Sequence, residues 1–441
     1  MMRKYEKYKD SGVEWIGEVP EHWNKCRLKF NCCLKGRIGW NGLRSDEFET
    51  DSYAYLVTGQ DFNSSDIEWS KCYQLNKNRY EEDPFIQLKN GDLLITKDGT
   101  IGKIAKVSNM DKSACLNSGI FVMKQKSKKN EFTQGFLYWL LCSDLFKAFN
   151  QYTTTGTTIL HLYQNVFENM PLLIPSLPEQ QSIASYLDSK VGEIDNMIEK
   201  TEKKIKLYEE LKKSIITRAV TKGLNPNAKM KDSGVEWIGE VPEHWEAMKV
   251  TWIYQLIGSG TTPKTDKEYY YCENGEYWLQ TGDLNDGIIR NTSKQITKEC
   301  VKELNFKIYP KGSLVVAMYG ATIGKVGLLN IETTTNQACC VLAKSSIMLS
   351  KFSYFVFIAA KQSLILKSSG GGQPNISQDK IRNHYLPVPS IDEQCNIVEY
   401  LDSKTSTIDS QISITHKRID LLKELKSSLI TNVVTGKIKV C

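Results

Sequence analysis

Lys9–Trp23 reads KDSGVEWIGEVPEHW, and Lys231–Trp245 reads KDSGVEWIGEVPEHW again. Fifteen identical residues at an offset of 222 identify an internal duplication. A second repeat follows at an offset of 214, where residues 177–223 and 391–437 share 23 of 47 positions without a gap. The sequence is therefore internally duplicated, and its fold must be explained as two related halves.

The second repeat predicts two long helices. Ser176 with Glu179, and Ser390 with Glu393, fit the capping box that begins a helix. Within 177–223, only Gly192 interrupts the run before Gly223, which is placed to end it. Each helix would be about 65 Å long at about 1.5 Å per residue.

Apolar residues recur along both helices at steps of four and three, which is typical of a coiled coil. The first seam is Leu187, Val191, Ile194, Ile198, Thr201, Ile205, Tyr208, Leu211 and Ile215. The second seam is Leu401, Thr405, Ile408, Ile412, Thr415, Ile419, Leu422, Leu425 and Leu429. A helix with one apolar stripe needs a partner, and we expect antiparallel pairing of the two copies around a pseudo-two-fold axis. The alternative is that each helix packs on its own domain.

Between the repeats lie two segments, 24–176 and 246–390, that match poorly but share a skeleton. Thr100-Ile101-Gly102-Lys103 in the first, for example, recurs as Thr322-Ile323-Gly324-Lys325 in the second. Short runs of β-type residues predict strands in both, with a helix at Thr133–Gln151 and another at Phe352–Lys367. The predicted strands are Tyr53–Val57, Asp92–Thr96, Ile101–Val107 and Ile120–Met123 in the first, and Tyr277–Gln280, Ser313–Ala317, Ile323–Leu329 and Ala338–Leu342 in the second.

The expected fold class is therefore α+β, with two α/β domains and two long antiparallel coiled-coil helices in an internal repeat. The domain boundaries that we predict are 1–176 and 224–390 for the variable domains, and 177–223 and 391–441 for the helical segments.

Composition excludes several classes of protein. The net charge of +6 permits binding to a polyanion without requiring it. The longest apolar stretches, Phe136–Cys142 and Phe352–Ala360, are too short to span a bilayer. The chain starts with charged residues and no apolar run, so we expect no secretory signal and a cytoplasmic protein. The twelve cysteines, which show no C-x-x-C spacing, are then interpreted as reduced thiols without zinc.

A search for catalytic motifs finds none. Gly320–Val326 resembles a phosphate loop but lacks one spacer residue and the following Ser or Thr. The five histidines form no metal-binding motif, and His22 and His244 lie inside the identical segments. What remains is a set of loops rich in Thr, Gln, Asn, Lys and Tyr, which are residues that hydrogen-bond DNA phosphates and base edges. Solvated loops of no special function would have the same composition.

This architecture resembles the specificity subunits of type I restriction-modification systems over essentially the whole chain. The most telling residues are GVEWIGEVPEHW at 12–23 and 234–245, and the helix start Pro387–Gln394. Pro175-Ser176 carries half of that helix start in the first copy. Gly372–Ile376 also looks like family sequence, whereas the first domain departs from it with Thr153–Thr158 and then Ile159-Leu160-His161.

The resemblance implies that each variable domain is a target-recognition domain for one half of a split DNA sequence. It also implies that the paired helices fix the spacer and dock two modification (methyltransferase) subunits, which a restriction (translocase/nuclease) subunit would join. S-adenosylmethionine, ATP and Mg²⁺ would then belong to those partners, and this chain would be non-catalytic.

Two other readings stay open from the residues alone. One is a two-headed coiled-coil adaptor that binds protein partners, and the other is a nuclease or methyltransferase with an unrecognised site. For the favoured function we predict a DNA-facing set from the loop contexts, namely Lys97, Thr100, Lys103, Gln280, Lys325, Gln373 and Asn375.

Overall fold

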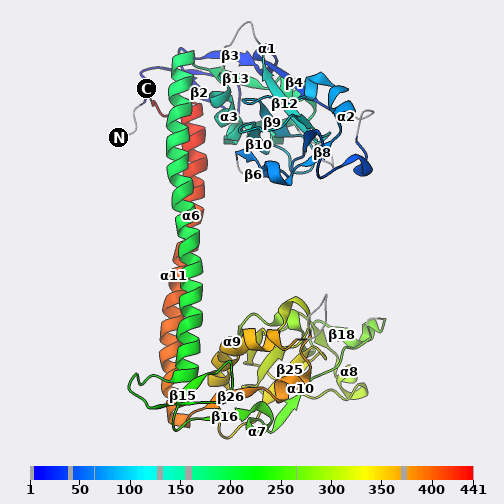
Figure 1. Cartoon of the computed structure of the whole chain (residues 1–441), viewed down its shortest axis with the longest axis vertical. Helices are drawn as coiled ribbons and strands as arrows, with labels where there is room; N and C mark the ends of the chain where they lie inside the picture. The colour runs from blue at the N-terminus through cyan, green and yellow to red at the C-terminus, as the bar shows by residue number, and fades with distance from the viewer. Residues whose placement is uncertain are drawn as a thin grey trace. The chain divides into compact units, whose positions relative to one another are not determined.

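The computed structural model describes residues 4–37, 43–63, 65–126, 133–153, 161–264, 266–368 and 375–440. The chain divides into two compact units, of which unit 1 is Met1–Thr201 with Lys417–Cys441 and unit 2 is Glu202–His416. Each unit holds one variable domain and a part of both long helices (Figure 1).

The variable domain of unit 1 is built on two small sheets. An antiparallel sheet has the order β10-β9-β12-β4, and a second sheet has the order β11-β5-β8, in which β11 and β5 are parallel. The strand bounds are β4 Cys32–Gly36, β5 Ala54–Val57, β8 Tyr73–Leu75, β9 Leu93–Thr96, β10 Ile104–Lys106, β11 Ala114–Leu116 and β12 Ile120–Gln125. Strands β9 and β12 carry runs of buried apolar residues, as strands covered on both faces should.

The variable domain of unit 2 repeats this plan with additions. Its first sheet has the order β17-β25-β22-β23-β20, and its second has the order β18-β21-β19-β24, in which β19 and β24 are again parallel. The strand bounds are β17 Leu256–Gly258, β18 Tyr271–Cys272, β19 Glu276–Leu279, β20 Gly287–Ile289, β21 Gln295–Ile296, β22 Leu314–Ala317, β23 Val326–Leu329, β24 Thr334–Thr335 and β25 Cys339–Ala343. The prediction of an α+β fold with an internal repeat is confirmed.

Short strand pairs join each domain to the long helices. The identical segments form the hairpins β1 (Tyr8–Asp10) with β2 (Glu18–Pro20) and β14 (Met230–Asp232) with β15 (Glu240–Pro242). Next to them, β3 pairs with β13 and β16 pairs with β26, both antiparallel. The bounds of these strands are β3 Asn24–Arg27, β13 Pro171–Ile174, β16 Glu246–Lys249 and β26 Tyr385–Val388.

The domain helices follow the prediction with one correction. In unit 2, α9 (Ser350–Leu366) is a single helix, but the predicted helix Thr133–Gln151 is two helices, α3 (Gln134–Cys142) and α4 (Asp144–Thr153). The break lies at Ser143, whose hydroxyl bonds the carbonyl of Leu140 and caps the amide of Leu145. Another small difference is that β10 begins at Ile104, because residues 97–103 form a turn.

The two long helices are α6 (Leu177–Lys222) and α11 (Ile391–Val434). They run side by side in both units (Figure 1). In unit 1, Lys426 donates to Asp195 over 2.7 Å, and in unit 2, Lys212 donates to Asp409 over 2.7 Å. Moving 17 residues forward along α6, from Asp195 to Lys212, moves the partner 17 residues back along α11. The pairing is therefore antiparallel. Because of the internal repeat, the two ion pairs join equivalent residues.

The predicted seam is correct at most positions and wrong at two. Leu187, Val191 and Ile205 are buried, as expected of seam residues. Leu211 and Leu425, which hold the same place in the two copies, are instead 47% and 50% exposed. Each of these leucines lies three residues after the preceding seam residue, where the alternation of four and three requires four. The regular repeat instead passes through Lys212 and Ala219, and the buried residues beyond Ile205 include Ile216, Ala219 and Val220.

Trp23 and Trp245, the last residues of the repeated fifteen-residue segment, make equivalent contacts in the two units. Both side chains are fully buried, and the indole Nε1 donates to Glu179 over 3.3 Å in unit 1 and to Glu393 over 3.2 Å in unit 2. These glutamates lie in the first turn of α6 and α11, respectively. Each tryptophan thus anchors the start of a long helix.

Each indole also meets the end of the other long helix. A Cβ on Gly436 would lie 3.2 Å from the Trp23 ring, and a Cβ on Gly223 would lie 3.2 Å from the Trp245 ring. Both glycines have positive φ, of +71° and +68°. We call Trp23 with Glu179 and Gly436, and Trp245 with Glu393 and Gly223, the two tryptophan clamps.

The carboxylates of the clamps accept several hydrogen bonds. Burial alone would raise the pKa of Glu393, but hydrogen bonds from His244, Trp245 and Ser390 outweigh it and lower that pKa. The predicted capping box is present at Ser390: its hydroxyl accepts from the Glu393 amide over 3.4 Å, and the Glu393 carboxylate accepts from the Ser390 amide over 3.4 Å. Glu179 instead accepts from Tyr5, His22 and Trp23.

His384 gives the stability of unit 2 a predicted pH dependence. Its ring is fully buried and stacked on Trp237, with centroids 5.4 Å apart. Burial, and then the nearby Lys367, lower its pKa from 6.5 to about 3. As the pH falls, the unfolded chain therefore protonates His384 before the folded chain does. The contribution of the neutral, buried imidazole to the free energy of unfolding is complete above pH 6.5 and is lost as the pH falls from 6.5 towards 3. The slope is at most about 1.4 kcal/mol per pH unit.

We expect wild-type chain to lose about 1–2 kcal/mol more unfolding free energy than His384→Met between pH 7.5 and 5.0. Methionine is the matched replacement because Met170 holds the equivalent buried position in unit 1. Urea unfolding at both pH values measures the difference. Equal losses in the two proteins would contradict the assignment.

Candidate nucleic-acid interface

Backbone hydrogen bonds bring three loops of unit 1, and Leu162, to one edge of its domain. The amide of Asn117 donates to Val57 over 2.9 Å, joining the ends of two parallel strands. The amide of Lys97 donates to Gly119 over 2.9 Å, and the Lys97 carbonyl accepts from Leu162 over 2.9 Å. The loops that begin after β5, β9 and β11 therefore lie next to one another, and Leu162 lies beside them.

Unit 2 has the equivalent three backbone hydrogen bonds, and we call this set of bonds the ladder. Its bonds run from Asn336 to Leu279 (3.0 Å), from Met318 to Ala338 (2.8 Å) and from Ile376 to Met318 (2.9 Å). The two domains thus present equivalent loop edges although their sequences differ. This equivalence fixes which residues correspond, since Lys97 matches Met318 and Leu162 matches Ile376.

The first predicted loop is held in the same way in both units. In unit 1 the buried Asp61 accepts from the Thr58 amide over 2.7 Å and from the Thr58 hydroxyl over 2.9 Å. In unit 2 Asp283 accepts from the Gln280 amide over 2.9 Å. These aspartates are structural, and they hold Thr58 and Gln280 at the edge.

The second predicted loop connects β9 to β10, and β22 to β23. The amide of Thr96 bonds the carbonyl of Lys103 over 3.0 Å, and the amide of Ala317 bonds that of Lys325 over 2.8 Å. The loop of unit 2 is one residue longer. It contains a single short helical turn at Gly320–Thr322 and leads into a strand, so it does not open a helix as a phosphate loop would.

Three of the predicted DNA-facing residues come together in unit 1. A cavity of about 480 Å³ opens between the loops and includes the exposed Thr100 and Lys103. Lys97 adjoins it, with its ammonium 4.9 Å from the centre of the Phe121 ring. The cavity is lined by Phe48, Thr58, Gly59, Gln60, Tyr73, Thr96, Asp98, Thr100, Lys103, Asn117 and Gly119.

Three predicted residues can also be placed in unit 2. Gln280 begins the first loop, Lys325 ends the second and is half-buried, and Asn375 is exposed beside Tyr319, to which its backbone is bridged. Gln373 lies outside the described residues.

Sequence reasoning missed two features of this edge. One is the pair of asparagines, Asn117 and Asn336, whose signal was available because both follow the strand that pairs in parallel with β5 or β19. The other is a contact between Asp98 and His161, in which a carboxylate oxygen and the ring Nδ1 share a hydrogen bond. These two residues are 63 apart in the sequence, so no local pattern could reveal them.

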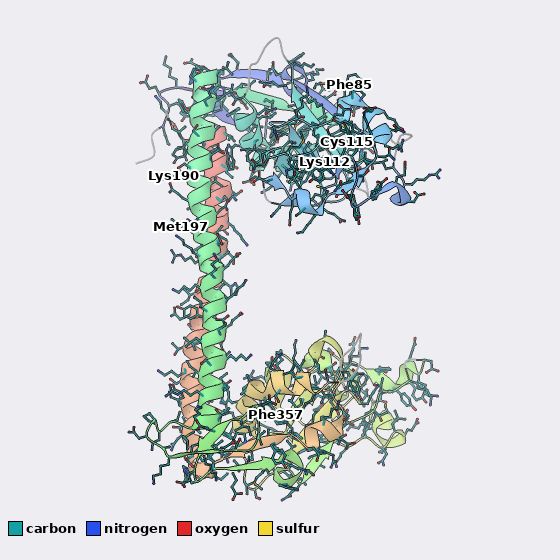
Figure 2. The ribbon with its side chains drawn as sticks, in the orientation of Figure 1. Phe85, Lys112, Cys115, Lys190, Met197 and Phe357 are labelled. Atoms are coloured by element: carbon teal, nitrogen blue, oxygen red, sulfur yellow. The ribbon has the colours of Figure 1, made fainter. Side chains whose placement is uncertain are left out.

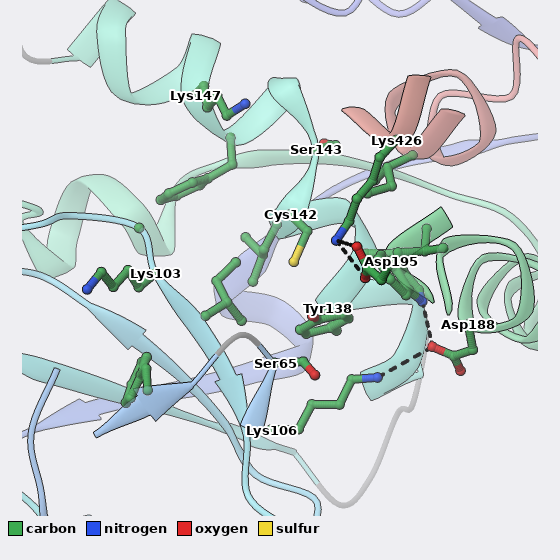
Figure 3. A pocket seen from close by; sticks show the side chains of 18 of the residues that line it. Ser65, Lys103, Lys106, Tyr138, Cys142, Ser143, Lys147, Asp188, Asp195 and Lys426 are labelled. Carbon is green, nitrogen blue, oxygen red and sulfur yellow. Dashed lines mark hydrogen bonds and ion pairs between the residues drawn. The ribbon is translucent and has the colours of Figure 1, made fainter. Parts of the chain in front are cut away.

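A second cavity, of about 660 Å³, lies in unit 1 where the domain meets the helices (Figure 3). Lys106 of β10 lies 3.6 Å from Asp188 of α6, which also accepts from the indole of Trp139 over 2.9 Å. The Lys426–Asp195 pair lies beside them (Figure 3). Three lysines of its lining, Lys106, Lys147 and Lys426, are paired with aspartates, so these residues form a joint between the domain and the helices.

The described cysteines are free thiols in mostly buried surroundings. Burial raises the pKa of Cys115 to about 11 and that of Cys340 to about 12, so both are protonated at neutral pH. Within the described ranges, no three His, Cys, Asp or Glu side chains come together as metal ligands would. Of the helices in those ranges, none combines the length and hydrophobicity that crossing a bilayer requires.

Three comparisons, with relatives of known name, with solved structures and with a family model, point to the same family. The specificity subunit of the type I restriction enzyme MjaVIII of Methanocaldococcus jannaschii is 27% identical over 437 residues, which cover 96% of this chain and 94% of that protein. The specificity subunit of the EcoKI enzyme of Escherichia coli K12 is 20% identical over 438 residues, which cover 96% and 90%.

Two solved structures share the fold. One chain, from work on complex assembly and conformational transition of the type I R-M system, superimposes with a TM-score of 0.73 at 17% identity, over 95% of this chain and 99% of that one. The HsdS subunit of Thermoanaerobacter tengcongensis gives a TM-score of 0.52 at 16% identity, over 95% and 98%.

The family model of the type I restriction modification DNA specificity domain matches twice, at residues 44–208 and 242–424. Each match covers most of one variable domain and part of the long helix that follows it. The repeat found in the sequence, the two equivalent loop edges and these matches agree, and the chain belongs to the family of type I restriction-modification DNA specificity proteins.

Proposed function

We propose that this chain is the sequence-reading subunit of a type I restriction-modification complex and that each variable domain reads one half of a bipartite, asymmetric DNA target. The observation that carries the proposal is the pair of equivalent loop edges. Both have the same backbone ladder and a lysine at the same place, Lys103 or Lys325, but different side chains around it. Two unlike half-sites require shared contacts to the DNA backbone and different side chains that read the bases.

The long helices are proposed to set the spacer between the half-sites. Half-site separation is a geometric quantity, so it needs a rigid element of defined length. The antiparallel pair supports this role because Asp195–Lys426 and Asp409–Lys212 define one register.

The decisive experiment maps methylated adenines across a genome in cells that express this chain with its modification subunit. We expect a split motif with a fixed spacer, and exchange of residues 24–176 for those of a relative should change one half only. If the complex assembles and no motif appears, the proposal is wrong and the two-headed adaptor becomes the better function.

The partner surface is proposed from exposed leucines that both copies share. Leu207 and Leu421 hold equivalent places on α6 and α11, and each is 64% exposed. One turn further along, Leu211 and Leu425 are equivalent and also exposed. Leucines four apart on a solvent-facing helix form an apolar strip that suits an amphipathic partner helix. One strip in each unit fits two copies of the same partner, the modification subunit.

We expect Leu207→Ser with Leu211→Ser to reduce the number of bound modification subunits from two to one. Adding Leu421→Ser and Leu425→Ser should reduce it to none, since exposed leucines contribute little to the fold. Native mass spectrometry of the assembled complex counts the subunits. Met197→Gln is the matched control, because Met197 is 47% exposed on α6 (Figure 2) and the other copy has Gln411 in its place. Two subunits bound to the fourfold variant would contradict this surface.

Catalysis is proposed to belong to the partners, together with the sites for S-adenosylmethionine, ATP and Mg²⁺, in a cytoplasmic complex that a restriction subunit can join. The purified chain should neither cleave DNA with Mg²⁺ nor methylate it with S-adenosylmethionine. Either activity, if it survived removal of trace partners, would contradict this part of the proposal.

A further inference from the structure

The matched loop edges allow the two domains to be compared position by position. Because Lys97 matches Met318, the next residues Asp98 and Tyr319 hold the same place. Because Leu162 matches Ile376, the preceding residues His161 and Asn375 also hold the same place. We call Asp98 with His161, and Tyr319 with Asn375, the variable pairs.

The members of each variable pair are adjacent in space. In unit 1 the carboxylate of Asp98 shares a hydrogen bond with His161, whose ring also packs edge-on against Tyr163 at 4.7 Å. In unit 2 the backbones of Tyr319 and Asn375 form an isolated bridge. The backbone thus brings the same two positions together in both units and leaves their side chains free to differ.

Both variable pairs lie at the loop edge and reach solvent. The side chains of Asp98 and His161 are 47% and 32% exposed, and Asp98 lines the 480 Å³ cavity. Tyr319 is 40% exposed, and Asn375 is exposed beside it.

The chemistry of the pairs favours contact with base edges over contact with phosphates. A carboxylate repels phosphate, so Asp98 does not suit a phosphate clamp, whereas the shared Lys103 and Lys325 do. The bond to Asp98 uses Nδ1 of His161 and leaves Nε2 as the second polar atom of the ring. In unit 2, an asparagine carboxamide can bond both N6 and N7 of adenine in the major groove.

We propose that the variable pairs are the base-selecting positions of the two domains and that, on the same backbone, Asp98 with His161 and Tyr319 with Asn375 select different bases in the two half-sites. This inference rests on the proposed function. It separates the loop edge into shared residues, which give affinity without sequence preference, and two positions that set part of the preference.

The test grafts the pair of unit 2 onto unit 1 as Asp98→Tyr with His161→Asn in the full chain, assembled with its modification subunit. Binding is measured on duplexes in which each base pair of the first half-site is changed in turn. We expect the graft to bind the original half-site about 10- to 100-fold less tightly and to prefer another base at one or two positions. The second half-site and the spacer should not change.

Lys103→Ala is the matched control in the same cavity. It should weaken binding to every sequence by the same factor and reduce the salt dependence by about one ion, without changing which bases are preferred. If Lys103→Ala instead changed the base preference, the division between shared and variable residues would be wrong.

A graft that ranks the base changes as wild type does would overturn the inference. If the graft does not fold, Asp98→Asn and His161→Gln, which keep the approximate size of the side chains but change their donor and acceptor groups, take its place and are judged by the same ranking. Failure of the proposed function gives a different result, because wild-type complex would then show no split motif at all.

Discussion

Residues 1–229, produced alone, are expected to associate into a symmetric dimer. In the whole chain, α6 pairs with α11 through residues that the repeat makes equivalent. A shortened chain carries both Asp195 and Lys212, so two copies can form the Asp195–Lys212 pair twice. Trp23 of one copy would likewise lie at Gly223 of the other, in place of Gly436.

Magnitudes show which interaction drives this association. An exposed ion pair contributes about 0–1 kcal/mol, whereas each buried Leu, Ile or Val side chain contributes about 1.5–3 kcal/mol. The seam residues Leu187, Val191 and Ile205 therefore supply the affinity, and the ion pairs define the register.

Sedimentation equilibrium should give twice the mass of the shortened chain, and Ile205→Asp should give the mass of one copy. With the modification subunit, the dimer should methylate a target made of two identical half-sites. A shortened chain that remained monomeric at micromolar concentration would show that the repeat is no longer interchangeable.

Trp23→Ala and Trp245→Ala are each expected to lower the free energy of unfolding by about 3–5 kcal/mol. Each indole is fully buried, so truncation leaves a cavity between the start of one long helix and the end of the other. Each change also removes the donor to Glu179 or Glu393, which leaves a partly buried carboxylate with one hydrogen bond fewer.

Urea unfolding followed by circular dichroism measures the loss, and limited proteolysis locates it. Trp23→Ala should expose cleavage sites in unit 1, and Trp245→Ala should expose them in unit 2. Trp252→Ala is the control, because that indole is 61% exposed and its loss should cost less than about 0.5 kcal/mol. A clamp variant as stable as Trp252→Ala would show that the clamp is not needed.

Much of the fold could be predicted because its signals are local or repeated. The caps and heptads of residues 177–223 and 391–437 predict α6 and α11 almost to the residue. The runs before Thr96 and Ala317 predict buried strands, since uninterrupted aliphatic residues are typical of strands covered on both faces. The prediction that failed at Ser143 concerns a side-chain cap, which does not change the pattern of apolar residues. The one that failed at Leu211 followed an apolar residue three positions after Tyr208, where the regular repeat falls on Lys212.

The candidate site was predicted only in part. Composition identified the loops that hold Thr100, Lys103 and Gln280, because Thr, Lys and Gln are common at DNA surfaces. It could not pair Asp98 with His161 or identify Asn117, because those contacts depend on strands that are distant in sequence.

The sequence by itself determined that the chain is a duplicated α+β protein with two unlike domains and two long helices, because identity at fixed offsets and seven-residue periodicity are properties of sequence. Only the tertiary structure decided which residues of the unlike domains correspond. That correspondence is carried by backbone hydrogen bonds, such as those of Lys97 and Met318, and backbone amides and carbonyls form the same ladder whichever side chains they bear.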